Sequence, residues 1–141
     1  MATTTPASSL PLEALNLATK PFDFARAGDT SVLKSYIAAG IPPNFTNQAG
    51  DTFLMLASYH GHADTTKMLL DAGAGPNSLN DRGQSSLAGS VFKGHVDAVK
   101  VLVEGGADME GGRPNAWECA EMFKRGDLLE VMRNAQYVSS L

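Results

Sequence analysis

The sequence repeats itself every 33 residues, and this period limits the chain to a fold built from stacked copies of one small unit. The clearest markers are two separate series of glycines. The residues that recur at this spacing are Gly28, Gly61 and Gly94; Gly40, Gly73 and Gly106; Gly50 and Gly83; His62 and His95; Asn44 and Asn77; and Leu54 and Leu87. Such repeats share one continuous core and present an extended surface, which favours binding over catalysis.

Composition narrows the class of protein further. The 141 residues are 43% hydrophobic and 18% charged, which suits one domain with a continuous core. The formal net charge of -4 argues against a nucleic-acid binder, because such proteins usually carry a basic excess. Residues 1–10 lack the features of a signal peptide, and no segment approaches the roughly 20 apolar residues that span a bilayer. With one cysteine, Cys119, we expect a cytoplasmic protein without membrane association, a nuclear location being the alternative.

Two internal stretches show the repeat unit most completely. Each begins at a turn glycine, Gly50 or Gly83, where a positive φ is expected. A short apolar helix follows and ends at Gly61 or Gly94, because glycine adopts a left-handed helix end at the least cost. The second helices carry apolar stripes at the i, i+3, i+4 spacing of a buried face. These stripes are Thr66, Leu69 and Leu70, and Val99, Leu102 and Val103.

This order of turn, helix, Gly-His corner, second helix and glycine loop resembles the ankyrin repeat over about residues 20–134. The resemblance implies an all-α solenoid of helix-turn-helix pairs joined by short hairpin-like turns, with two internal repeats between N- and C-terminal capping units. We expect a disordered tail at 1–10 and a C-terminal tail at 136–141. The repeat domain at 11–135 is expected to comprise units of about 11–45, 46–78, 79–110 and 111–135. The Thr-Pro-Leu-His motif of the family is lost, and Gly89 inside a first helix costs about 1 kcal/mol relative to alanine.

The terminal units depart from the repeat. In the first unit we expect a helix from Phe22, with Pro21 in its first turn and a further turn over residues 11–18. In the last unit, Gly94 and Gly126 are 32 residues apart, which indicates one missing residue. This alignment places Cys119 on the position of Leu54, and Asn134 and Ala135 on those of Leu69 and Leu70.

No set of residues indicates catalysis or metal binding. His62 and His95 are equivalent corner residues, and no cluster of cysteine and histidine has zinc-binding spacing. Cys119 falls on a leucine position, so we expect it to be buried and unreactive. The glycines form neither a Walker loop nor a dinucleotide fingerprint. We therefore predict no enzymatic activity, cofactor, metal ion or small-molecule substrate.

The candidate binding residues are those that the repeat does not need for its core. In ankyrin folds the two residues before the corner glycine and the turn tips face the concave surface, and the resemblance assigns partner binding to these positions. The candidates are Arg26, Gln48, Asp51, Tyr59, His60, Arg82, Gln84, Phe92, Lys93, Lys124 and Arg125. Tyr59 and Phe92 are predicted to form a short exposed ladder of rings. With Arg113 and Asp81 included, this face carries six basic and two acidic residues, which leaves a charge of -8 for the rest.

The resemblance implies a non-catalytic protein-protein interaction module or a small regulatory adaptor. Aromatic anchors among basic residues would bind another protein with an acidic surface patch, and we expect a monomer. As an alternative, the loop residues Asn44 and Asn77 resemble asparagines that are hydroxylated in some ankyrin repeats, although Pro43 and Pro76 precede them where an aliphatic residue is favoured. An enzyme would need a base beside a nucleophile, and a nucleic-acid binder an aromatic-rich motif. The sequence shows neither.

Overall fold

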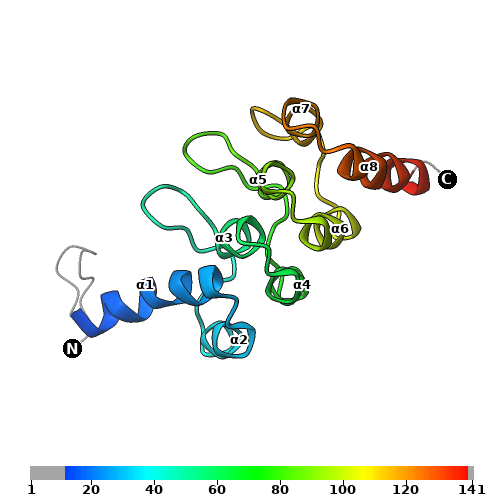
Figure 1. Ribbon diagram of the computed structural model, residues 1–141. Helices are drawn as coiled ribbons and strands as arrows, with labels where there is room; N and C mark the ends of the chain where they lie inside the picture. The colour runs from blue at the N-terminus through cyan, green and yellow to red at the C-terminus, as the bar shows by residue number, and fades with distance from the viewer. Residues whose placement is uncertain (1–11, 140–141) are drawn as a thin grey trace.

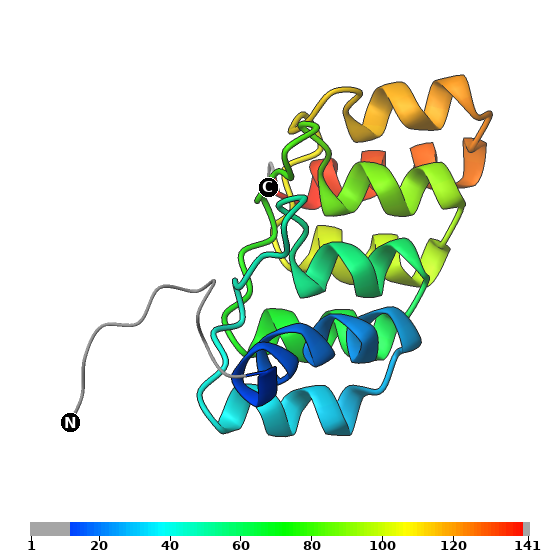
Figure 2. The ribbon, with the colours of Figure 1, turned by 90° about the vertical axis from the view of Figure 1, so that its left-hand side faces the viewer.

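The computed structural model describes residues 12–139 and shows an all-α solenoid over this part of the chain. Figure 1 shows the helices in two rows, with α1, α3, α5 and α7 in one and α2, α4, α6 and α8 in the other, and neighbours in each row contact one another. Figure 2 shows the helix pairs stacked one above the next. The helices are α1 (Leu12–Ala27), α2 (Thr30–Ala38), α3 (Phe53–Tyr59), α4 (Ala63–Asp71), α5 (Ser86–Lys93), α6 (Val96–Glu104), α7 (Ala116–Met122) and α8 (Gly126–Ser139).

Hairpin-like turns join the helix pairs and stack on one another beside the first row of helices (Figure 1). Isolated antiparallel bridges close two of them, between Thr46 and Thr52 and between Leu79 and Ser85. Backbone hydrogen bonds then join successive turns, since the Asp81 N–H donates to the carbonyl of residue 49 at 3.0 Å and the N–H of residue 113 donates to that of residue 83 at 2.9 Å. The turns therefore form a continuous edge without forming a sheet in the described residues.

The core runs the length of the stack between the two rows of helices. No single helix pair encloses its own core, because each apolar stripe is covered by the next pair. The predicted stripe residues Leu69 and Leu102 are fully buried, and so are Leu33 and Met132 in the terminal units. Phe22 and Phe53 join the first unit to the second, with their ring centroids 4.7 Å apart.

Glycines with positive φ form the corners between the first and second helices of each pair. The φ angles of Gly28, Gly61 and Gly94 are 77°, 80° and 76°, which confirms the predicted helix ends. The predicted positive φ of the turn glycines Gly50 and Gly83 is also confirmed, at 79° and 73°.

The side chain that follows each corner covers the glycine of the preceding unit. The His62 ring lies over Gly28 and the His95 ring over Gly61, where an added Cβ would lie 2.5 Å and 2.7 Å from ring atoms. The Nε2 atom of His62 also lies 2.7 Å from the carbonyl oxygen of Arg26, within hydrogen-bonding distance. The absence of a side chain on each corner glycine therefore allows neighbouring units to approach closely.

The structure corrects the predicted alignment of the last unit. The side chains of Thr52, Ser85 and Asn115 cap the first helices, each accepting a hydrogen bond from the backbone N–H three residues further on. These caps are 33 and then 30 residues apart, so the last unit lacks three residues where the sequence indicated one. Cys119 consequently aligns with Leu56, and its predicted alignment with Leu54 is wrong by two positions.

The ends of the solenoid also differ from expectation. The first helix, α1, is continuous from Leu12, so Pro21 lies inside it and not in its first turn. The last helix, α8, continues to Ser139, four residues beyond the predicted end of the repeat domain. Within it Met132, and not Asn134, takes the place of Leu69. The predicted tail at residues 1–10 lies outside the described residues. Between residues 12 and 139, no helix combines the length and the apolar character needed to cross a bilayer.

Replacing Gly94 with valine is expected to lower the melting temperature. At a φ of 76° the valine backbone would be strained, and its Cβ would lie 3.0 Å from the guanidinium of Arg125. The left-handed conformation costs an L-residue about 1–2 kcal/mol. Since about 1 kcal/mol shifts a domain of this size by roughly 4 °C, we expect a decrease of at least about 4 °C in thermal unfolding followed by circular dichroism.

Gly126→Ala is the matched control, because a Cβ added at Gly126 meets nothing within 4 Å. It is expected to melt like the wild type. Equal melting curves for G94V and the wild type would contradict the role assigned to the corner.

Candidate functional site

A hollow of about 480 Å³ lies on the face formed by α3, α5, α7 and the adjoining turns, which we call the groove. Three equivalent positions, each four residues after its helix cap, line it in order along the stack: Leu56, Gly89 and Cys119. Because the middle residue is a glycine, no side chain fills the centre of this row. The local cause of the hollow is therefore the choice of small residues in α5 and α7.

Aromatic rings and a methionine line the groove one helical turn further on. Tyr59, Phe92 and Met122 are equivalent, and Phe123 follows them. Tyr59 and Phe92 are each 38% exposed, as expected of the predicted ladder. The ring that Phe92 contacts, however, is Phe123, with centroids 4.6 Å apart in a T-shaped arrangement. The aromatic surface thus extends over the last unit as well.

The charged groups around the groove differ in whether they already form hydrogen bonds within the protein. The carboxylate of Asp51 accepts hydrogen bonds from the side-chain amides of Asn80 at 2.9 Å and Asn47 at 3.5 Å. Arg82 lines the groove, and the ammonium of Lys93 lies 5.3 Å from the centroid of the Tyr59 ring. At this distance the ammonium makes a cation-π contact, which leaves its hydrogen-bond donors available to a partner.

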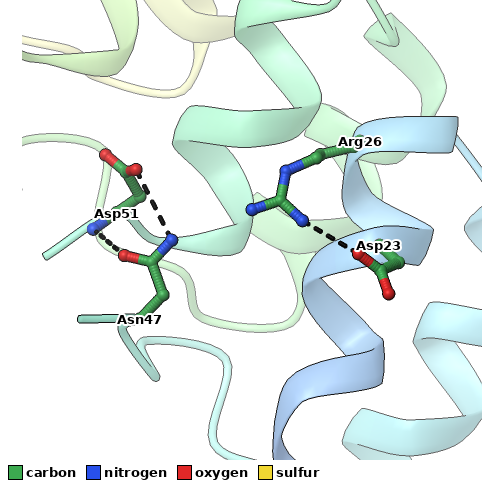
Figure 3. A network of polar contacts seen from close by, with 4 residues as sticks. All are labelled: Asp23, Arg26, Asn47 and Asp51. Carbon is green, nitrogen blue, oxygen red and sulfur yellow. Dashed lines mark hydrogen bonds and ion pairs between the residues drawn. The ribbon is translucent and has the colours of Figure 1, made fainter. Parts of the chain in front are cut away.

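Arg26 and Asn47 do not line the groove, although Asp51 of the same turn as Asn47 does. In Figure 3 the guanidinium of Arg26 turns back along α1 to Asp23, with which it forms an ion pair at 2.9 Å, and Asn47 contacts Asp51 within the turn. The Oδ1 atom of Asn47 also accepts the backbone N–H of Asp51 at 2.9 Å. Asn47 therefore both shapes the turn and fixes the carboxylate of Asp51.

The structure brings together just over half of the predicted binding residues. Those that line the groove are Asp51, Tyr59, His60, Arg82, Gln84 and Phe92. Lys93 lies beside them over Tyr59, whereas Arg26 and Gln48 lie away from the hollow.

Lys124 and Arg125 were predicted from the wrong alignment, and the structure corrects their placement. Lys124 occupies the corner position held elsewhere by glycine, with a φ of 55°. Arg125 occupies the position of His62 and His95, where its guanidinium covers Gly94 and donates to the carbonyl of residue 92 at 2.9 Å. Arg125 thus joins units at a corner, and its place on the aromatic face is taken by Phe123.

The predicted list missed Met122, Phe123 and Gly89, all of which line the groove. A signal for the first two was present in the sequence. Asn115 and Glu118 form a capping box, in which each side chain accepts the backbone N–H of the other at 2.9 Å. The spacing of these residue types marks a helix start. Counting from that start places Met122 and Phe123 beside Phe92.

The loop asparagines have structural contacts. The Oδ1 atom of Asn44 accepts the N–H of Gly75 at 2.8 Å, and that of Asn77 accepts the N–H of Asp108 at 2.7 Å. Each amide therefore ties its loop to the loop of the following unit. Within residues 12–139, no group of three or more histidine, cysteine and acidic side chains is arranged to hold a metal ion.

The pKa of His60 reports the electrostatic environment of the groove. Partial burial lowers this pKa first, and the surrounding positive groups lower it further. These groups are His62, Lys93, Arg26 and His95. With its pKa below the ordinary value of about 6.5, the imidazole of His60 is predominantly uncharged at neutral pH.

The comparisons with known proteins agree with this architecture. A family model described as ankyrin repeats in three copies matches residues 22–111, which is more than half of the chain. The protein therefore belongs to the ankyrin repeat family.

A relative in Pseudomonas aeruginosa, named as an ankyrin repeat protein (PA3287), is 44% identical over 66 residues. This match covers 47% of the present chain and 39% of the relative. The chain thus matches well under half of that protein's length. Ankyrin repeats generally mediate protein-protein interaction, which is the coarse function that the family implies.

The imidazole of His60 is expected to titrate with a midpoint below its ordinary value of about 6.5 in an NMR pH titration. Because the unfolded chain takes up this proton at higher pH than the folded protein, the contribution of His60 to stability is present above about pH 6.5 and is lost as the pH falls. Lys93→Gln should raise the midpoint, since it removes a nearby positive charge. Lys67→Gln, which alters an ion pair on α4, should leave it unchanged. A midpoint at or above 6.5 in the wild type would contradict this description.

Cys119 is expected to react slowly with a thiol reagent in the native protein. Its side chain is buried, and burial first and the carboxylate of Glu118 second raise the pKa of its thiol. Only the thiolate reacts, so both effects slow labelling. The measurement is the labelling rate at neutral pH, with the protein unfolded in guanidinium as the control. Equal rates in the two states would show that the native structure does not protect this thiol.

Proposed function

We propose that this protein is a non-catalytic interaction module that binds an acidic region of another protein through the groove. The observation that carries the proposal is the aromatic surface of Tyr59, Phe92 and Phe123 beside two cationic side chains. The three rings are 38%, 38% and 41% exposed. Large aromatic side chains and arginine are enriched among the residues that dominate binding energy at protein interfaces.

The cations beside the groove are available to an acidic partner. Among the described residues, ion pairs join Arg26 to Asp23 and Lys67 to Asp71, and Arg82 and Lys93 take part in neither. A carboxylate from a partner would therefore meet cations without displacing an internal ion pair. Small regulatory adaptors work in this way, by holding one surface of a partner without altering it chemically.

The test is the double substitution Tyr59→Ala with Phe92→Ala. Both rings are partly exposed, so the fold should persist, while the loss of desolvated anchors should weaken partner capture by at least about tenfold, or about 1.4 kcal/mol. The measurement is quantitative mass spectrometry of proteins captured from an extract of the source cells. Higher salt should also slow association, because the cations that steer the partner become screened.

The matched control is Val32→Ala with Val138→Ala, because these valines are 40% and 67% exposed and lie outside the groove. This control should capture the same proteins as the wild type. If the aromatic double variant melts normally and captures them equally well, binding through the groove is excluded.

A further inference from the structure

We propose that the hollow over Gly89 receives one aromatic or long aliphatic side chain from an acidic segment of the partner, and that Gly89 determines this specificity by leaving room for it. The inference rests on the proposed function, since it takes the groove as the binding surface. It adds the chemistry of the group that enters the groove and the residue that admits it.

The backbone does not require a glycine at position 89. The residue lies inside α5, where glycine destabilises a helix relative to alanine, and it is not one of the glycines with positive φ. The equivalent residues in α3 and α7 are Leu56 and Cys119, so the repeat accepts a side chain at this position. A Cβ added to Gly89 would lie 3.3 Å from Cδ1 of Tyr59. The Tyr59 ring therefore packs closely against this glycine, and a larger side chain at position 89 would have to displace the ring, which lines the hollow.

The hollow is large enough to admit an apolar side chain, and its walls suit one. Its volume of about 480 Å³ lies in the lower part of the range typical of ligand pockets, about 300–1,000 Å³. Tyr59 bounds it on the side of α3, and Phe92 and Phe123 bound it on the side of α5 and α7. Aromatic walls favour a further ring in an edge-to-face or offset arrangement, and they also accept an aliphatic chain.

Charge complementarity identifies the residues that flank this side chain as acidic. Arg82 and Lys93 are exposed near the hollow and belong to neither internal ion pair. The one carboxylate that lines the groove, Asp51, already accepts hydrogen bonds at both oxygens, from Asn80 and Asn47. Two cations and one carboxylate therefore face a bound segment, so the balance of charge is positive and basic residues in that segment would be repelled.

The experiment uses a synthetic nine-residue peptide with one phenylalanine flanked by aspartates, titrated into isotopically labelled full-length protein and followed by NMR. Amide shifts are expected at Tyr59, Gly89, Phe92 and Phe123. Replacing the phenylalanine of the peptide with alanine should weaken binding about tenfold, the equivalent of about 1.4 kcal/mol. A peptide with asparagines in place of the aspartates should bind more weakly than the acidic one, and Arg82→Gln with Lys93→Gln should remove this difference.

The decisive protein variant is Gly89→Leu, which fills the hollow with the side chain that α3 carries at Leu56. It should weaken binding of the acidic peptide by about tenfold. Gly126→Leu is the matched control, because it adds the same side chain where nothing lies within 4 Å, and it should bind like the wild type. Phe123→Ala, which removes a wall of the hollow at an exposed residue, provides a second variant if G89L fails to fold.

Equal affinity of the wild type and folded G89L would overturn the inference, as would amide shifts confined to other surfaces or equal binding of the phenylalanine and alanine peptides. Equal binding of acidic and neutral peptides would overturn the assignment of an acidic segment. If one of these results is found and the Tyr59 and Phe92 double variant still loses partner capture, this inference is refuted but the proposed function stands. Unchanged capture by that double variant would instead refute the proposed function.

Discussion

The stack depends on close contact between successive units at their corners. Each corner glycine adopts a φ that an L-residue with a side chain reaches only with strain, and a ring or guanidinium of the next unit occupies the space that a side chain would need. This contact fixes the separation of the units, and that separation brings Leu69 and Leu102 together in one continuous core. Since no helix pair buries its apolar stripe alone, loss of one corner would expose the core of two units.

The same corners explain how much of the fold could be predicted from the sequence. Where a glycine marks the corner, the 33-residue spacing gave the helix ends and turns correctly. In the last unit Lys124 holds the corner, and Arg125 takes the place of the histidine that follows each earlier corner, so both markers are absent. Gly126 lies two residues beyond Lys124 and suggested the wrong register. The capping box at Asn115 indicates the correct register, but a search based on the spacing of glycines does not detect this motif. At the other end, Pro21 suggested a helix start because proline suits a first turn, yet α1 continues through it.

The residues of the candidate site were likewise predicted where glycines define the register and missed where they do not. Tyr59, Phe92 and Arg82 were predicted because they lie in units whose register the glycines define. Phe123 was missed because its row could be counted only from a cap that no glycine marks. The sequence showed that Gly89 destabilises its helix. Its place in the hollow, however, depends on Tyr59 of α3 and on α7. Such contacts between units cannot be predicted from one repeat alone. The face as a whole could therefore be inferred from the family, whereas its central feature required the coordinates.

The pairing of glycine and histidine at successive corners also bears on how the chain could change in length. Gly28 meets His62 and Gly61 meets His95 through the same kind of contact. A duplicated segment of residues 62–94 would present a histidine to the unit before it and a glycine to the unit after it, so both of its junctions would reproduce contacts that already exist. The junction to the last unit differs, because Arg125 replaces histidine and three residues are missing. Growth by duplication is thus open in the middle of the chain, whereas a duplicate of the C-terminal unit would present a lysine at the corner where the other units present a glycine.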